Sequence, residues 1–409
     1  MTNAMRLGWV LVFLVAASAA QAQSRNLSAE PVAAPAASIR VASPVKPPPP
    51  TIADLVLLLQ SYKPDPERIA RLRAEMEAAV PTGDDPDVLA VAWHKKSIAA
   101  GELQELERQV EFIEQALGFA RRAKGVNPNG LGSYQRVRTE YASSLFSTRS
   151  AAAALDSFAE FIAENEKNPP NGYLIHSHCQ MAHSYLHLGD IERARASLDK
   201  AEAMYKRLAG RQPVALLLPG WSKQIELVRG FLLRREGHIE AEERAILAAV
   251  RQAEDELATL PKRQERGIYA PPVSRVEAGV DSMRIWLAQT KVPQERLEDA
   301  ELMLREVLKR SLARDGRNSP LVGRALMTLR ILFTNRGRYA EALVIGEWAD
   351  KTLAEGGISE RSPMRLNTRI GLAVALSTMG RHQEAAALTD VIRGTLIDDT
   401  RLEEGFANG

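Results

Sequence analysis

The hydrophobic residues between Ile175 and Tyr205 recur every three or four positions, which is the spacing of an amphipathic helix. The large residues of this pattern are Met181, Tyr185, Leu188, Ile191, Leu198 and Tyr205. The sequence Leu-Gly-Asp at 188–190 interrupts the pattern and predicts a turn between two helices. Small residues that allow the two helices to cross closely are Ala182, Ala194 and Ala201. One hairpin of about 30 residues cannot bury its own apolar face, so similar hairpins are expected on either side.

Similar helix pairs are predicted along most of the chain. They are 134–146 with 151–165, 222–236 with 239–257, 271–289 with 294–312, 324–336 with 339–353, and 365–379 with 382–396. The equivalent turn residues Arg149, Gly189, Gly237, Gly337 and Gly380 follow one another at steps of 40, 48, 100 and 43 residues. The long step has room for one further unit with its turn near Glu295. This regular spacing predicts an all-α solenoid built from antiparallel helix pairs.

Two of the turns carry the residues of a known repeat. The stretches Asn-Arg-Gly-Arg-Tyr-Ala-Glu-Ala-Leu at 335–343 and Thr-Met-Gly-Arg-His-Gln-Glu-Ala-Ala at 378–386 have a glycine, an aromatic residue and alanines in the same order. With Gly189 and Ala194 of the 175–205 unit, they resemble the tetratricopeptide repeat, and the resemblance covers roughly 133–396. It implies a right-handed superhelix whose concave groove holds a peptide segment of a partner without catalysis. Degenerate repeats of this kind also resemble those found ahead of caspase-like CHAT protease domains.

The first 22 residues are typical of a secretory signal peptide. Arg6 provides a positive start, an apolar core of about 13 residues follows at 7–19, and Ala-Gln-Ala at 20–22 fits a cleavage site. This core is shorter than the roughly 20 residues that a membrane-spanning helix needs. We therefore expect cleavage near Gln23, a periplasmic or secreted protein, and no stable membrane span after cleavage.

The remaining sequence divides into four predicted regions. These are a Pro/Ala-rich linker at 23–51, an irregular N-terminal helical region at 52–132, the repeat array at 133–396 and a C-terminal tail at 397–409. The linker ends in four consecutive prolines, whose fixed backbone and missing N–H groups favour a semi-rigid spacer over a packed core.

Composition narrows the possible partners. Aromatic residues make up 5% of the chain, which favours helices over strands. The formal net charge of +2 is too small to predict nucleic acid as a partner. Cys179 is the only cysteine, so the chain cannot form an intramolecular disulfide. The sequence predicts no oligomeric state.

Four of the seven histidines lie at 176–187, and His176, Cys179, His183 and His187 share one helical face about 80° wide. Counted back from the turn glycine, these residues occupy the row that faces the groove in the repeat family. Three interpretations stay open: a polar groove wall that binds a peptide, an ordinary packed or solvated helix face, and a Zn²⁺ or Cu⁺ site. A straight helix spreads the four residues over about 16 Å, so one ion could use two or three of them at most. A histidine groove wall would bind peptide more weakly as the pH falls through about 6.5.

The same counting from the other turns gives the neighbouring groove walls. They comprise Arg136, Thr139, Ser143 and Ser147, then Gln224, Leu227, Phe231 and Arg235, then Arg324, Met327, Ile331 and Asn335. This mixed surface, with several arginines and little acid, would suit a peptide that carries carboxylates and a few apolar anchors. The alternative is that these are solvated helix faces.

Motifs that would indicate catalysis are absent from the sequence. It contains no GxxxxGK[ST], GxSxG or HExxH motif and no paired CxxC. Cys179 lies within a long amphipathic helix, without the tight turn that would supply an oxyanion hole. We therefore predict an exported, non-catalytic scaffold that needs no cofactor and binds a protein or peptide partner. The alternatives are a regulatory region acting with a CHAT protease and a metal carrier that uses the histidine row.

Overall fold

The computed structural model describes residues 51–124 and 130–397. The predicted signal peptide at 1–22, nearly all of the linker and nearly all of the C-terminal tail lie outside the described residues. The chain divides into two compact units, 1–54 and 55–409. In the first unit, Thr51 and Asp54 form the start of a helix: the Thr51 N–H donates to the Asp54 carboxylate at 2.9 Å, and the Asp54 N–H donates to the Thr51 hydroxyl at 3.2 Å.

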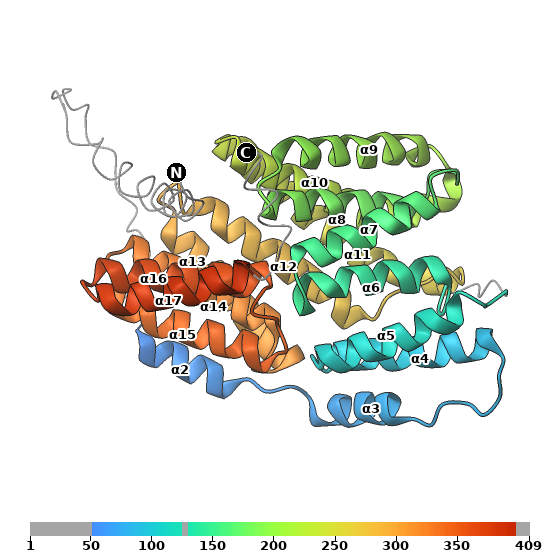
Figure 1. The fold of residues 1–409 in the computed structure, drawn as a ribbon, viewed down its shortest axis with the longest axis horizontal. Helices are drawn as coiled ribbons and strands as arrows, with labels where there is room; N and C mark the ends of the chain where they lie inside the picture. The colour runs from blue at the N-terminus through green and yellow to red at the C-terminus, as the bar shows by residue number, and fades with distance from the viewer. Residues whose placement is uncertain (1–50, 125–129, 398–409) are drawn as a thin grey trace, which may run out of the picture. The chain divides into compact units, whose positions relative to one another are not determined.

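Sixteen α-helices and one 3-10 helix occupy the described residues, and none of these residues is in a strand. The first half contains α2 (Ile52–Ser61), α3 (Pro66–Glu77), α4 (Pro86–Glu102), α5 (Leu106–Ala120), α6 (Tyr134–Thr148), α7 (Ala151–Glu164), α8 (Gly172–His187) and α9 (Ile191–Ala209). The second half contains η1 (Gln212–Leu217), α10 (Leu218–Arg235), α11 (Ile239–Glu265), α12 (Val273–Lys291), α13 (Leu297–Asp315), α14 (Pro320–Asn335), α15 (Tyr339–Glu355), α16 (Pro363–Thr378) and α17 (His382–Ile397). In the second unit, consecutive helices pack against one another in chain order (Figure 1), which confirms the predicted all-α solenoid of helix pairs.

Four helices begin with the same local signal, an acidic or hydroxyl residue followed by proline. The side chains of Asp65, Asp85, Ser319 and Ser362 each accept a backbone N–H from the first turn of α3, α4, α14 and α16. Proline at the first helical position loses no hydrogen bond, because that N–H has no partner inside the helix. These caps explain where the four helices start.

The turns between paired helices depend on left-handed backbone conformations. Gly189, Gly237, Gly337 and Gly380 have φ between 71° and 82°, which glycine adopts without a steric penalty. In the degenerate unit, Glu295 occupies the equivalent place with φ 60°. The predicted unit near Glu295 therefore keeps the turn geometry although it lacks the glycine.

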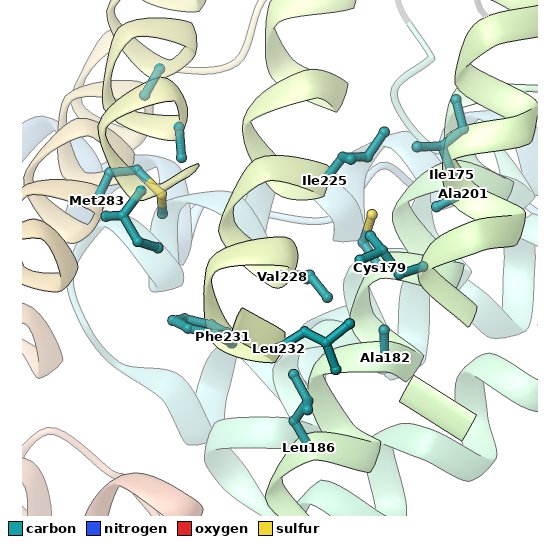
Figure 2. Close-up of a cluster of buried hydrophobic side chains, with 14 of the residues drawn as sticks. Ile175, Cys179, Ala182, Leu186, Ala201, Ile225, Val228, Phe231, Leu232 and Met283 are labelled. Carbon is teal, nitrogen blue, oxygen red and sulfur yellow. The ribbon is translucent and has the colours of Figure 1, made fainter. Parts of the chain in front are cut away.

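The largest apolar cluster joins several consecutive helices of the solenoid. Ile175, Ala182 and Leu186 of α8 face Ile225, Val228 and Leu232 of α10 (Figure 2). The cluster also includes Ala201 of α9, Ile246 of α11 and Met283 of α12. Each helix pair thus covers the apolar face of the next, as expected for units that cannot bury that face alone.

Contacts within the second unit also join its early and late helices. The Ser359 N–H donates to the carbonyl of Ser147 at 3.0 Å. Leu106 at the start of α5 packs against the cluster formed by Leu353, Ile358 and Met364. The predicted N-terminal helical region and repeat array therefore pack within one compact unit.

Candidate functional site

A cavity of about 1040 Å³ opens at the N-terminal ends of α6, α8, α10 and α12. The first turns of these helices supply part of its wall, and the connection from α11 to α12 supplies another part. The wall is mixed in character, with aromatic, amide, hydroxyl and charged side chains. The residues that line this wall include Arg136, Glu140, Ser143, Tyr173, His176, Arg211, Trp221, Gln224, Glu256, Arg263, Tyr269 and Arg275.

A chain of hydrogen bonds crosses three helices on the cavity wall. His176 Nε2 lies 3.0 Å from the Ser143 hydroxyl of α6, and His176 Nδ1 lies 2.7 Å from the Gln224 amide oxygen of α10. Burial lowers the pKa of His176, so its imidazole is neutral near pH 7. The structure thus brings together three residues that the sequence predicted for one groove.

Glu140 is the most strongly held carboxylate of the cavity. Its oxygens lie 3.2 Å from His94 Nε2, 3.4 Å from Arg275 Nη1 and 3.5 Å from Arg136 Nη1. Burial alone would raise the pKa of Glu140, but Arg275, His94 and Arg136 together hold that pKa well below its usual range. In return, the Glu140 charge raises the pKa of Arg275. This carboxylate is therefore ionised and fully engaged.

A second corner of the cavity carries donors that are not engaged. Arg263 is 3% exposed, and its Nε donates to the Leu216 carbonyl at 3.0 Å. Its Nη2, like the Tyr269 hydroxyl and Arg136 Nε, is buried and makes no hydrogen bond within the described part of the chain. The guanidinium of Arg136 lies 3.5 Å from the centre of the Tyr269 ring. We name Arg136, Arg263 and Tyr269 the donor corner.

Sequence reasoning missed most of this corner. Counting back from the turn glycines considers only the first helix of each pair, whereas Arg263 lies near the end of a second helix and Tyr269 lies in the connection that follows. A signal was present: α11 is 27 residues long, and a connection containing two prolines follows it. A long second helix followed by an extended connection indicates that this connection can reach the groove.

His183 and His187 lie among aromatic rings rather than on the cavity wall. The His183 ring stacks on Phe146 and Phe231 at centroid distances of 4.9 and 5.1 Å, and Phe231 meets Trp286 at 4.6 Å. Burial lowers the pKa of both histidines, to about 4 for His187. Protonation of this pair is therefore shifted to lower pH, and the predicted weakening of peptide binding near pH 6.5 stays a prediction.

Cys179 corrects the predicted histidine row. It is 1% exposed and belongs to the apolar cluster, where Ile175, Cys179, Ala182 and Leu186 form a stripe at spacings of four, three and four (Figure 2). This stripe faces the neighbouring helices, so the thiol cannot line a groove. Burial also raises the pKa of the thiol, which keeps it protonated. The apolar periodicity of α8 already contained this information.

The other predicted site residues have varied surroundings. Thr139 lines the cavity, but its hydroxyl donates to the carbonyl of Gln135 in its own helix at 2.8 Å. Phe231 is buried in the apolar cluster, which corrects its prediction as a groove-facing anchor. Arg235 donates to the Leu186 carbonyl at 3.2 Å.

Two further predicted residues lie on α14, away from the residues that line the cavity. Arg324 donates to the Ser282 hydroxyl at 2.7 Å and lies 5.3 Å from the Trp286 ring centre, and burial lowers its pKa to about 10. Asn335 is exposed and donates to the Ile331 carbonyl of its own helix at 2.9 Å. The predicted rows therefore do not form one continuous wall.

The three predicted metal ligands, Cys179, His183 and His187, do not lie together. His183 Nε2 and His187 Nε2 are 3.1 Å apart, whereas Cys179 belongs to the apolar stripe of α8. Across residues 51–124 and 130–397, no group of three or more His, Cys, Asp or Glu side chains is arranged to hold a metal ion.

None of the helices described by the structure is both long and apolar enough to cross a membrane.

Comparison with known protein families gives two matches, both to tetratricopeptide repeat models. They cover residues 175–207, in α8 and α9, and residues 366–390, in α16 and α17. These two helix pairs are similar to tetratricopeptide repeats. The repeat is a protein-interaction unit of a generally non-catalytic family. A search of curated proteins finds no match.

Three solved structures are similar to this chain at low sequence identity. A Rap protein complexed with competence and sporulation factor has a TM-score of 0.49 and 12% identity, covering 82% of this chain and 92% of its own. The apo form of RapI has a TM-score of 0.38 and 10% identity, with coverages of 78% and 80%. BtubC (BKLC) from P. vanneervenii has a TM-score of 0.37 and 17% identity, with coverages of 66% and 93%.

Proposed function

We propose that this protein is an exported, non-catalytic scaffold whose cavity binds a segment of a protein partner. The observation that carries the proposal is the cavity of about 1040 Å³ at the ends of α6, α8, α10 and α12. Tetratricopeptide repeats support a role in protein interaction, and the cavity offers a place where a partner's chain can enter. Its volume is at the upper end of the roughly 300–1,000 Å³ range of ligand pockets, so it suits a few residues of a peptide.

The chemistry of the cavity wall suits a peptide. Gln224 offers the N–H groups of its side-chain amide to a main-chain carbonyl, and Tyr173 and Trp221 offer flat apolar surfaces for a side chain. Large aromatic residues of this kind commonly carry much of the binding energy at protein interfaces. The mixed wall therefore supports recognition of a short segment with at least one large apolar side chain.

A non-catalytic role is supported by the state of the reactive groups. The Cys179 thiol is buried in the apolar cluster with a raised pKa, so it is a poor nucleophile. The Glu140 carboxylate is ionised and bound to Arg136, His94 and Arg275, which makes it a weak base.

Export is proposed from residues 1–22 alone. The direct measurement is the N-terminal sequence of the mature protein recovered from the periplasmic or secreted fraction of its host. A mature chain that begins near Gln23 would support export. An intact Met1 in a cytoplasmic fraction would contradict it.

The partner-binding proposal can be tested by affinity capture with matched surface variants. Arg211 lines the cavity and Arg207 lies outside it, and both side chains are exposed at the end of α9 or just after it. We expect the unaltered protein and Arg207→Glu to capture the same partner from the host's exported proteins, and Arg211→Glu to lose at least 80% of it. Equal capture by all three proteins, or no specific capture by the unaltered protein, would contradict the proposal. A caspase-like protease among the captured proteins would favour the regulatory alternative.

A further inference from the structure

The donor corner is the one part of the cavity whose polar atoms lack acceptors. Arg263 Nη2, Arg136 Nε and the Tyr269 hydroxyl are all buried and make no hydrogen bond within the described residues. Buried donors in folded proteins nearly always have a partner, and exceptions commonly mark a place for a ligand or an ion. All three residues line the same cavity. Because all three residues line the cavity, an acceptor bound in it is a partner that would satisfy these donors.

The charges around the corner favour an anionic acceptor. The cavity is lined by Arg136, Arg211, Arg263 and Arg275, against two carboxylates, Glu140 and Glu256. Glu140 is already held by two of these arginines and His94. Glu256 forms ion pairs with two cations: one oxygen pairs with Lys223, and the other lies 3.7 Å from Arg263 Nη2, too far for a hydrogen bond. Because Lys223 shares this carboxylate, Glu256 compensates the charge of Arg263 only in part.

Two further properties of the corner agree with this reading. Burial lowers the pKa of Arg263; the charge of Glu256 opposes this shift, and the nearby Arg136 guanidinium adds to it. The corner also belongs to a cavity at the N-terminal ends of α6, α8 and α10, where the helix dipole favours negative charge.

The surroundings of the donor corner also indicate how much negative charge its ligand carries. Lys223 and Arg263 share the single carboxylate of Glu256, so about one negative charge is missing beside Arg263, and a monoanion supplies it. A single carboxylate has two acceptor oxygens, which suit one guanidinium N–H and one phenol O–H. We propose that the donor corner binds one carboxylate group of the partner segment, next to a large apolar side chain that packs on the cavity's aromatic residues.

This inference rests on the proposed function, because it names the chemistry of the segment that enters the cavity. The carboxylate has two possible sources, the C-terminus of a chain and an Asp or Glu side chain. The contacts that recognise it come largely from the end of α11 and the connection to α12, outside the rows of the first helices. Tyr269→Phe removes one donor and, because that hydroxyl has no partner, leaves the fold intact.

Three small phenylalanine probes, which differ in whether and where they carry a carboxylate, test the proposal. N-acetyl-phenylalanine carries a terminal carboxylate, N-acetyl-aspartyl-phenylalaninamide carries a side-chain carboxylate, and N-acetyl-phenylalaninamide carries none. Binding of each to the full chain is measured by titration calorimetry or ligand-observed NMR. We expect at least one carboxylate probe to bind tenfold or more tightly than the amide, and the preferred probe identifies the source. Equal affinity for all three probes, or no binding of any probe at millimolar concentration, would overturn the proposal.

Variants assign the preference to the donor corner. Tyr269→Phe and Arg263→Gln should each reduce the carboxylate preference at least threefold, while Tyr205→Phe, a partly buried tyrosine of α9 outside the cavity lining, should leave it unchanged. Thermal unfolding of each variant shows whether the fold is retained. A preference that persists in folded Tyr269→Phe and Arg263→Gln would overturn the proposal. If partner capture still depends on Arg211 while the probes show no preference, the carboxylate site fails and the scaffold function stands.

Discussion

Replacing Glu140 with glutamine should destabilise the protein in a way that depends on pH. The carboxylate of Glu140 compensates Arg136 and Arg275 and accepts a hydrogen bond from His94. Glutamine keeps the size of the side chain but removes the charge, so the two guanidiniums lose their shared partner. Removing one partner of a buried ion pair costs about 3–5 kcal/mol. The Arg275 side chain is 43% exposed and solvent screens its charge, so we expect about 2–3 kcal/mol at pH 7.

The sign of the pH dependence follows from the depressed pKa of Glu140. The folded protein holds this pKa well below its usual range, whereas the unfolded chain titrates near the ordinary value of about 4.3. The stabilisation is therefore present in full above the ordinary pKa and is lost as the pH falls toward the folded-state pKa. The difference between the unaltered protein and Glu140→Gln should shrink between pH 7 and pH 3.

Urea unfolding followed by circular dichroism at both pH values measures this difference. The free-energy change is obtained from the shift in midpoint and the slope of the transition, provided the slope stays the same. Glu240→Gln is the control, because Glu240 is exposed and lies 3.9 Å from Arg244 on the surface; it should change the midpoint little at either pH. An equal stability difference for Glu140→Gln at pH 7 and pH 3 would refute the electrostatic reasoning.

Three further changes test other parts of the structure. Burial lowers the pKa of His187 to about 4, so the folded state favours the neutral imidazole and the stability of the protein should fall as the pH drops below about 6.5. His187→Gln should reduce that fall, as measured by urea unfolding at pH 7 and pH 4.5. Glu295→Gly should raise the free energy of unfolding by about 0.5–1 kcal/mol, since Glu295 has φ 60° and glycine relieves the strain; a lower free energy of unfolding would contradict this. Gly230→Ala should cost about 1–3 kcal/mol, because its Cβ would lie 2.5 Å from Ile246 Cδ1 in a packed interface; unchanged stability would show that the interface is loose. In the native protein, Cys179 should resist alkylation by iodoacetamide until urea unfolds the chain, since it is 1% exposed.

The helix pairs could be predicted from the sequence because their causes are local. Apolar residues at three- and four-residue spacing, together with turn glycines such as Gly189 and Gly337, determine where helices form and end. Within the predicted N-terminal helical region, the backbone departs from this code at Gln104. This residue adopts φ 62°, so α4 ends at Glu102 and α5 starts only at Leu106.

The candidate site was only partly predictable because it depends on long-range packing. Ser143, His176 and Gln224 meet because equivalent positions of stacked units become neighbours, which the repeat spacing already implied. Arg263 and Tyr269 reach the same cavity from the end of a long second helix and an irregular connection, whose path no periodic pattern encodes. The sequence therefore indicated the first helix of each pair as part of the site, but not the connection from α11 to α12 that completes the cavity.

The central claim is that stacked helix pairs leave a cavity that a partner segment occupies. The most direct measurement is site-specific photo-crosslinking in the host's exported proteins, with a photoreactive residue at position 224 on the cavity wall and, separately, at position 247, where Leu247 is 36% exposed on α11 outside the cavity. We predict one crosslinked partner at position 224 that is absent at position 247 and is lost in the Arg211→Glu background. Crosslinks of equal yield at both positions, or none at position 224, would contradict the account.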